Sequence, residues 1–309
     1  MTSFLPIFFC TLLMTEFVLG NFANGFIALV NFIDWVKRQR ISSADQILTA
    51  LAISRIGLLW AILIYWYTSV FFPGLYTIEV SMIIHSTWTV ANHFSIWFAT
   101  SLSIFYLFKI ANFSNLIFIH LKKTVKNVIV VILLGTLVIL FFNLVVINIY
   151  ESVNIKECKG NMTCKIKLRN FAKLSYVTVF TVANFLPFTA SLICFLLLIC
   201  SLCKHLKKMQ LYGKESQDTR TKIHIKSLQT VISFLLLLAV HFIYLFITVW
   251  NSDRPPTELD IMLRQAIGMI YPACHPLILI WGSSKLKQTF LSLFWQMKFL
   301  LKSQKPSTL

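Results

Sequence analysis

Charged residues are scarce in this chain, and acidic residues are scarcer than basic ones. Only 13% of the 309 residues are charged, about half the share found in soluble domains, whereas 57% are hydrophobic and the mean hydropathy is +0.76. Eleven Asp and Glu stand against 28 Lys and Arg, which gives a formal net charge of +17. This composition excludes a water-soluble globular domain and predicts a membrane protein.

The sequence also lacks the motifs that carry catalysis, cofactor binding or metal binding. It has no Gly-rich phosphate loop, no His/Cys cluster at zinc spacing, no G-x-S-x-G turn and no H-E-x-x-H. Glu16 is the only carboxylate inside a predicted membrane span, so a proton-relay transporter would lack the acids that it needs. We therefore predict no enzymatic activity, no cofactor and no metal site.

Long apolar runs are what the chain has in abundance. Windows of about 19 residues give seven candidate transmembrane spans, at residues 5–32, 47–71, 82–108, 128–149, 177–202, 228–250 and 261–282. We predict a single domain over residues 1–309, with its longest external loop at residues 150–176. The predicted fold class is all-α, a seven-transmembrane helix bundle.

Lys and Arg gather on one side of the predicted membrane. Nineteen of the 28 follow the first, third, fifth and seventh spans, whose ends share one side. Because cytoplasmic loops are enriched in Lys and Arg, the amino terminus is predicted outside the cell and the carboxyl terminus in the cytosol. The basic residues then lie beside anionic lipid, so membrane lipid is a predicted partner and nucleic acid is not.

The two ends of the chain carry signals of their own. The tail at residues 283–309 contains KLKQTFLSLFWQMKFLLK, in which apolar residues recur three or four apart with Lys between them. This spacing predicts a short amphipathic helix on the inner leaflet. The amino terminus, MTSFLPIFFC, lacks the basic region of a cleavable signal peptide, so the first span is predicted to be a retained anchor.

The third span combines an apolar length with a polar stripe. Residues 85–108 carry no formal charge, and this is enough helix to cross a bilayer core of about 30 Å. Polar and small side chains share one helical face through their spacing: Trp88, Asn92, Ser95, Ala99 and Ser103. Because a polar stripe inside a membrane must face protein or water, we expect the other helices to surround this span.

Two polar residues lie deep in predicted spans and need partners. Asn24 lies in the first span and Arg55 in the second, where an unpaired amide or guanidinium is unfavourable. Pro272 and Pro276 in the seventh span leave backbone carbonyls without their helical N–H partners. We favour a buried cluster of Asn24, Arg55 and the carbonyls near Pro276 that joins three helices. Snorkelling of Arg55 to the cytosolic surface is the alternative.

Covalent modification is predicted at one external position. Asn161 begins the sequon Asn161-Met162-Thr163 in the external loop, where it is accessible to glycosylation. The sequence leaves open a disulfide between Cys158 and Cys164, and it leaves open palmitoylation at the cytosolic end of the fifth span, which contains Cys200 and Cys203.

Several long stretches resemble the type 2 taste receptors, the bitter taste receptors, a family of seven-helix G-protein-coupled receptors. They are GNFANGFI, KRQRISSADQILTALAISR, WFATSLSIFYLFKIANFSN, LLICSLCKHLKKMQL, KIHIKSLQT and HPLILIWG, in this order over nearly the whole chain. The resemblance implies a plasma-membrane receptor for bitter small-molecule agonists, coupled to a gustducin-type heterotrimeric G protein.

The resemblance also implies roles for individual residues. It places a ligand cavity among the outer halves of the spans, with agonist contacts at Trp88, Asn92, Trp66, Asn184, His241, Gln265 and Met269. It implies G-protein contacts at Phe105, Tyr106 and Lys109. We also predict contacts at Lys207 and Lys208, because the basic cytosolic end of the fifth span is a natural docking surface for a soluble partner. The residue chemistry agrees at Trp88 and Asn92. The indole of Trp88 can stack on diverse ligands, and the amide of Asn92, one turn away, can both donate and accept hydrogen bonds.

A multi-span transporter or channel is the alternative function. It would need paired broken helices or rings of charge in a pore, whereas only the fifth and seventh spans contain interior prolines. A membrane enzyme would need a catalytic constellation that the sequence does not contain.

Overall fold

A computed structural model gives the fold of the chain and describes residues 4–38, 41–75, 77–111, 115–155, 162–211, 217–250 and 257–303. Within these ranges every regular element is a helix, so the predicted all-α class is confirmed. The helices are α1 (Phe4–Arg38), α2 (Ser43–Phe71), the 3-10 turn η1 (Pro73–Leu75), α3 (Ile78–Ile110), α4 (Leu116–Lys123), α5 (Val125–Ile155), α6 (Met162–Leu211), α7 (Gln217–Trp250), α8 (Glu258–Gly282) and α9 (Ser284–Ser303).

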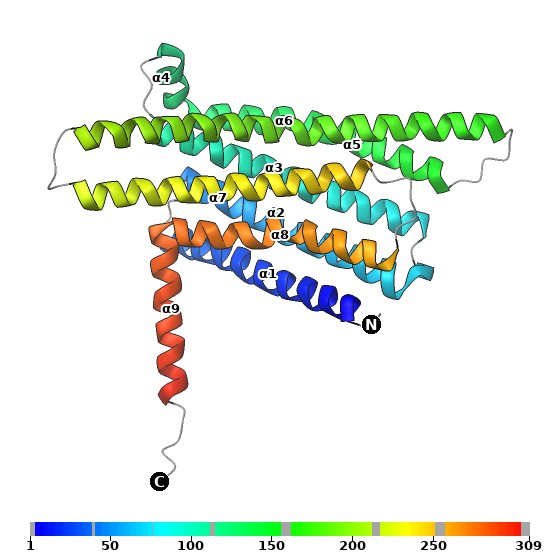
Figure 1. Cartoon of the computed structure of the whole chain (residues 1–309), viewed down its shortest axis with the longest axis horizontal. Coiled ribbons are helices and arrows are strands. Elements are labelled where there is room, and N and C mark those ends of the chain that lie inside the picture. Colours follow the sequence, from blue (N-terminus) through cyan, green and yellow to red (C-terminus); the bar gives the residue numbers. More distant parts are fainter. Residues whose placement is uncertain are drawn as a thin grey trace, which may run out of the picture.

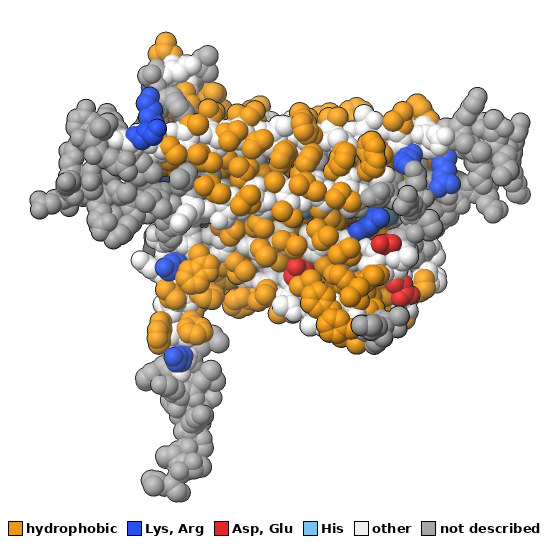
Figure 2. All heavy atoms as spheres, in the orientation of Figure 1, with side chains coloured by type: hydrophobic (Ala, Val, Ile, Leu, Met, Phe, Trp, Pro, Cys, Tyr) orange, Lys and Arg blue, Asp and Glu red, His pale blue; other side chains and the backbone are white. Residues whose placement is uncertain are grey.

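The helices have the lengths and surfaces of a membrane bundle. In the part of the chain that the structure describes, six helices are long and apolar enough to cross a membrane, namely α1, α2, α3, α5, α6 and α7. Helix α8 meets the same test together with α9, from which a 96° bend separates it. Figure 2 shows apolar side chains over the middle of the bundle, with Lys and Arg toward its ends. The predicted seven-helix membrane bundle is confirmed.

Helix α3 lies at the centre of the bundle (Figure 1). It contacts α2, α5 and α6, and the outer ring closes through contacts of α6 with α7, α7 with α8, and α1 with both α8 and α2. The polar stripe of α3 faces these neighbours, because Asn92, Ser95 and Ser103 are buried. The amino terminus lies at one end of the bundle, called here the amino-terminal end, and α9 leaves the opposite end, called here the α9 end (Figure 1).

Side-chain caps fix where two of the helices begin. At the start of α2, the Ser42 hydroxyl accepts a hydrogen bond from the backbone N–H of Asp45 at 3.1 Å. At the start of α8, Thr257 and Asp260 form a reciprocal capping box. These contacts satisfy N–H groups that have no partner within the helix.

Helices α1 and α8 approach each other closely at Gly20. A Cβ atom at this position would lie 2.8 Å from Leu59 Cδ1 and 3.1 Å from the Cα atom of Ala273. A Cβ atom at Gly25, on the same helix, would meet nothing within 4 Å. The contact between α1 and α8 therefore depends on the absence of a side chain at Gly20.

Lys285 joins three helices at the α9 end. Its Nζ atom lies 2.6 Å from Asp34 Oδ2 of α1 and 3.5 Å from Asp45 Oδ2 of α2. It also donates to Asn31 Oδ1 at 3.1 Å. Since Lys285 is in the first turn of α9, these contacts fix the direction in which α9 leaves the bundle.

Helix occupies most of the segment predicted as the external loop at residues 150–176. Helix α5 continues to Ile155 and α6 begins at Met162, so the loop prediction is wrong over these residues. The physical reason is that no Gly or Pro occurs between Met162 and Pro187, so nothing interrupts the helix beyond the membrane. Helix α4 is a further short helix that hydropathy does not predict.

Candidate functional site

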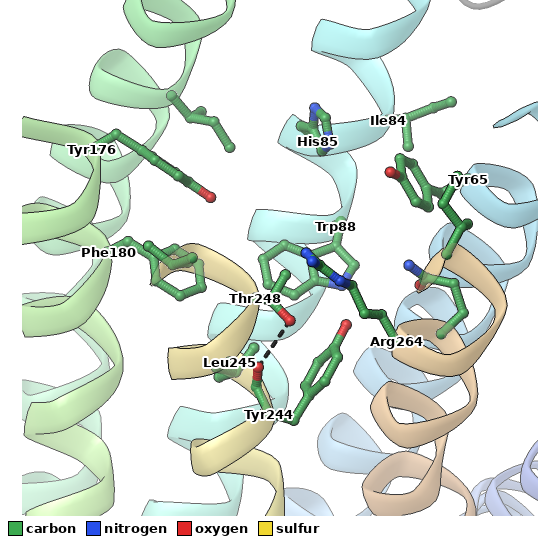
Figure 3. A pocket seen from close by; sticks show the side chains of 14 residues that line it. Tyr65, Ile84, His85, Trp88, Tyr176, Phe180, Tyr244, Leu245, Thr248 and Arg264 are labelled. Atoms are coloured by element: carbon green, nitrogen blue, oxygen red, sulfur yellow. Dashed lines mark hydrogen bonds between the residues drawn. The ribbon is translucent and has the colours of Figure 1, made fainter. Parts of the chain in front are cut away.

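A cavity of about 130 Å³ (Figure 3) is lined by residues near the starts of α3 and α8 and near the end of α7, and these helix ends lie at the amino-terminal end of the bundle (Figure 1). Its lining comes from α2, α3, α5, α6, α7 and α8 and is mainly aromatic and aliphatic, with a few polar groups. This composition is usual for a small-molecule site. The volume is below the roughly 300 Å³ at which pockets for drug-sized ligands begin.

Aromatic rings stack along one side of the cavity. The ring centroid of Trp88 in α3 lies 6.0 Å from that of Phe180 in α6, with 13° between the ring planes. The Phe180 ring lies 5.7 Å from Tyr176, and Tyr176 stacks on Tyr150 of α5 at 4.7 Å. Flat ring faces at this spacing can accept a further aromatic ring from a ligand.

Polar side chains enter the cavity from several helices. Arg264 of α8 extends toward Trp88 (Figure 3). His85 of α3 lies with its Nδ1 atom 3.0 Å from Glu151 Oε1 of α5. The hydroxyl of Thr248 donates to the backbone carbonyl oxygen of the residue one turn earlier in α7, at 2.8 Å. Arg264 therefore offers guanidinium N–H donors at the side of the cavity formed by α8.

An amide and imidazole network lies directly below the cavity. Asn92 Nδ2 donates to Asn184 Oδ1 at 3.1 Å, and Asn184 Nδ2 donates to the carbonyl oxygen of Phe180 at 2.8 Å. His241 Nε2 lies 3.3 Å from Asn92 Oδ1, which requires the ring proton on Nε2. The His241 ring also stacks on Tyr271 at 4.6 Å. This network connects α3 to α6, α7 and α8.

Trp66 and Met269 lie behind the cavity wall. Both belong to a buried cluster of α1, α2 and α8 side chains that includes Leu13. The Trp66 ring packs edge-on against Phe71 with 5.4 Å between centroids, whereas the neighbouring Tyr65 lines the cavity. The seven residues implied as agonist contacts thus fall into three places: Trp88 and Gln265 line the cavity, Asn92, Asn184 and His241 lie below it, and Trp66 and Met269 lie behind it.

Asn24 and Arg55 join three helices through separate contacts. Asn24 Nδ2 of α1 donates to the carbonyl oxygen of Pro272 in α8 at 3.0 Å. Pro276 has no N–H to give to that carbonyl four residues earlier, so the Asn24 amide replaces the missing donor. Arg55 of α2 is completely buried, and its guanidinium carbon lies 4.8 Å from the ring centroid of Tyr271. Among the described residues no hydrogen bond joins its guanidinium to a backbone carbonyl.

Similarity to known proteins extends over nearly the whole chain. The family model for taste receptor proteins matches residues 1–298. The chain belongs to the taste receptor protein family. It is 63% identical over 308 residues to the putative taste receptor type 2 member 33 of Homo sapiens, with 100% of both chains covered. It is 60% identical to taste receptor type 2 member 20 of Pan paniscus and 59% identical to member 31 of Pan troglodytes, over the same length and coverage.

The α9 end of this taste receptor carries the residues implied as G-protein contacts. Phe105 and Tyr106 are half-buried in α3, with 6.2 Å between their ring centroids. Lys109 is exposed in the last turn of α3, and its Nζ atom lies 5.8 Å from the Phe105 ring. Lys207 is exposed on α6, and the side chain of Lys208 lies outside the described residues. The described members of this set therefore lie at the same end as α9.

Some predicted modification sites of the taste receptor lie where the structure describes nothing. Asn161 and Cys158 lie outside the described residues, as does the side chain of Cys164. Glycosylation and the disulfide therefore remain predictions. Cys200 is exposed and Cys203 is half-buried, and both are free thiols.

Sequence reasoning about this taste receptor missed cavity residues that helical spacing could have indicated. Tyr176 and Phe180 precede Asn184 by two turns and one turn of α6, so the three share a face. Arg264 directly precedes Gln265, and both line the cavity. Arg264 lies inside the outer end of a predicted span, and this position alone could have indicated a cavity residue, because charged side chains within the membrane commonly face a cavity.

Proposed function

We propose that this chain is a receptor that binds bitter small molecules in the cavity at the amino-terminal end and activates a gustducin-type heterotrimeric G protein at the α9 end. The observation that carries the proposal is a largely apolar cavity that contains Trp88 and lies above a hydrogen-bonded amide network, in a chain of the taste receptor family. A response that depends on the G protein separates a receptor from a transporter.

The agonist side of the proposal follows from the lining of the cavity. The stacked faces of Trp88 and Phe180 suit flat or bulky apolar ligands, and neither ring demands one particular ligand shape. Gln265 and Arg264 add hydrogen-bond donors at the edge. Such a site supports recognition of many ligands with weak individual affinity.

The route from agonist to G protein is proposed to pass through the network below the cavity. Asn92 is bonded to α6 and lies beside His241 of α7, so a ligand that displaces Trp88 one turn above it disturbs contacts of three helices. Displacement of α6 and α7 would alter the surface near Lys207, Lys109 and Tyr106. The exposed cations there suit an acidic partner surface.

We also propose that the amino-terminal end faces outward at the plasma membrane. The amino terminus and α9 lie at opposite ends of the bundle (Figure 1), which is the arrangement that an odd number of spans produces. The predominance of Lys and Arg in the segments expected at the α9 end supports its placement in the cytosol.

Asn161→Gln is expected to remove the glycan from the receptor and thereby to report its orientation. Asn161 lies in the sequence between the end of α5 and the start of α6, and both of these helix ends lie at the amino-terminal end of the bundle (Figure 1), so only an outward orientation exposes the sequon to glycosylation. The electrophoretic mobility of the wild type should increase on glycosidase treatment, and that of the variant should not change. A wild-type chain without a glycan, combined with an amino-terminal tag that antibodies reach only in permeabilised cells, would contradict the orientation.

Trp88→Ala is expected to raise the EC50 of agonists by roughly 10- to 100-fold, because a buried aromatic anchor commonly contributes about 2 kcal/mol or more. The measurement is calcium release in cells that express the receptor with a gustducin-type G protein, under a panel of bitter compounds. Trp60→Ala is the matched control, since Trp60 is half exposed on α2 and does not line the cavity. If Trp88→Ala reaches the surface normally and its dose-response curves match those of the wild type for every agonist, the proposed site is refuted.

Solute flux that persists without any G protein would favour a transporter.

A further inference from the structure

A second, smaller cavity lies beneath the agonist cavity and is called here the lower chamber. Its volume is about 10 Å³, which is close to the least space that holds one water molecule. Side chains of α3, α5 and α6 surround it. Trp88 and Phe180 line both cavities, so this stacked ring pair separates the lower chamber from the agonist cavity.

Four buried polar atoms on side chains that line the lower chamber have no hydrogen-bond partner among the described residues. They are Thr89 Oγ1, His93 Nε2, Trp97 Nε1 and Asn143 Oδ1, on side chains that are 2%, 5%, 7% and 4% exposed. Buried polar atoms in folded proteins almost always have partners. Four exceptions around one small cavity indicate that the cavity receives a polar group.

The chemistry of the lining specifies which kind of polar group fits. Trp97 Nε1 only donates and Asn143 Oδ1 only accepts, whereas Thr89 and His93 can do either. Pro187 also lines the lower chamber, and it has no N–H for the carbonyl of Ala183, a second lining residue. No Asp, Glu, Lys or Arg lines the lower chamber. A neutral group that both donates and accepts matches this lining, and a hydroxyl is the smallest such group that a ligand carries.

We infer that the lower chamber is a deep subsite that holds water in the resting receptor and takes a neutral hydroxyl group of an agonist when the Trp88 and Phe180 rings separate. The inference rests on the proposed function, because it makes the lower chamber an extension of the agonist site. A hydroxyl in the lower chamber would also adjoin Asn92 and Asn184, which line it and join α3 to α6. Hydroxylated agonists thereby gain contacts that their deoxy analogues lack.

The first experiment tests the lower chamber without any agonist. Asn143→Cys is placed in a background whose seven native cysteines are replaced by alanine, and its reaction with methanethiosulfonate ethylammonium is timed. We expect the reaction to be slow with Phe180 present and at least about tenfold faster with Phe180→Ala, because removal of the ring opens the lower chamber to the cavity above. Thr136→Cys, two turns away on α5, is the control and should not change. Equal rates for Asn143→Cys with and without Phe180 would overturn the inference.

The second experiment tests the class of ligand. Neutral aromatic alcohols and their deoxy analogues are applied in pairs to cells that express the wild type, Asn143→Leu or Thr136→Val. Asn143→Leu is expected to raise the EC50 of activating alcohols about tenfold, the effect of one lost buried hydrogen bond, and to leave the deoxy analogues within about twofold. Thr136→Val is the control, because its hydroxyl donates within α5, to the carbonyl of Leu133, and does not line the lower chamber.

Each outcome of the second experiment decides something. The subsite is overturned if Asn143→Leu leaves the EC50 of the alcohols unchanged. It is also overturned if Asn143→Leu raises the EC50 of the alcohols and of their deoxy analogues by the same factor. A wild-type receptor that reaches the surface and stays silent to these pairs and to a wide panel of bitter compounds would instead contradict the proposed function. The labelling rates then remain the independent test of the lower chamber.

Discussion

Arg55→Ala is expected to remove most of the folded receptor from the cell surface. The Arg55 side chain is 0% exposed and packs against the Tyr271 ring between α2 and α8. Truncation to alanine leaves a cavity at this contact, and large-to-small changes in a packed core typically destabilise by about 2–5 kcal/mol. That is a large part of the roughly 5–15 kcal/mol that holds a typical protein folded. Surface expression and the thermal stability of the detergent-solubilised receptor are the measurements.

Arg55→Met separates packing from charge at the same position. Methionine keeps much of the side-chain volume and carries no charge, so a stable Arg55→Met variant would show that the guanidinium acts mainly by filling space. A Met variant as unstable as the Ala variant would assign the effect to the contact of the cation with Tyr271. Normal trafficking and signalling of Arg55→Ala would contradict a stabilising role for this side chain in the core.

Gly20→Val is expected to prevent α1 from packing against α8 and to reduce folded receptor as strongly as Arg55→Ala. The added Cβ would lie 3.1 Å from the Cα atom of Ala273, which is backbone and cannot rotate away, and 2.8 Å from a terminal carbon of Leu59. Overpacking of this kind typically destabilises by about 1–3 kcal/mol, and a contact with backbone leaves less room for relief. Receptor yield after affinity capture and its melting temperature measure the effect.

Gly25→Val is the matched control for the variant at Gly20. Both glycines lie in α1, five residues apart, but a Cβ atom at Gly25 meets nothing within 4 Å. The two variants share the same change of helix propensity, so their difference isolates the steric contact. Equal stability of the two variants would show that α1 does not depend on close approach at Gly20.

The number of membrane helices and the central position of α3 could be predicted from the sequence, because both depend on the order of neighbouring residues along the chain. Seven runs of sufficient length predict seven helices, and the stripe on α3 predicts that this helix is central, which its burial confirms. The short helix after Gly282 was also predicted, from the spacing of apolar residues in the tail. Hydropathy could not show that α6 continues far beyond the membrane, because it measures apolar content and not helix continuity.

The cavity was less accessible, because it depends on how each helix is rotated about its axis. Adjacent residues on a helix point about 100° apart. The resemblance implied Trp66, whereas Tyr65 lines the cavity and Trp66 packs toward α1 and α8. The sequence predicted that Asn24 and Arg55 would meet carbonyls of the last span. In the structure Asn24 bonds the carbonyl of Pro272, whereas Arg55 packs on the ring of Tyr271, which depends on how α2 and α8 approach each other. Long-range packing decides such pairings.

The small volume of the cavity bears on how strongly any agonist could bind under the proposed function. A volume of about 130 Å³ is too small for most molecules of drug size, so an agonist would require receptors in which the lining side chains have moved apart. The measured dissociation constant is then the intrinsic one divided by the fraction of receptors that are open. Modest sensitivity to chemically unrelated agonists would thus be a shared property of the resting receptor, set before any particular molecule arrives.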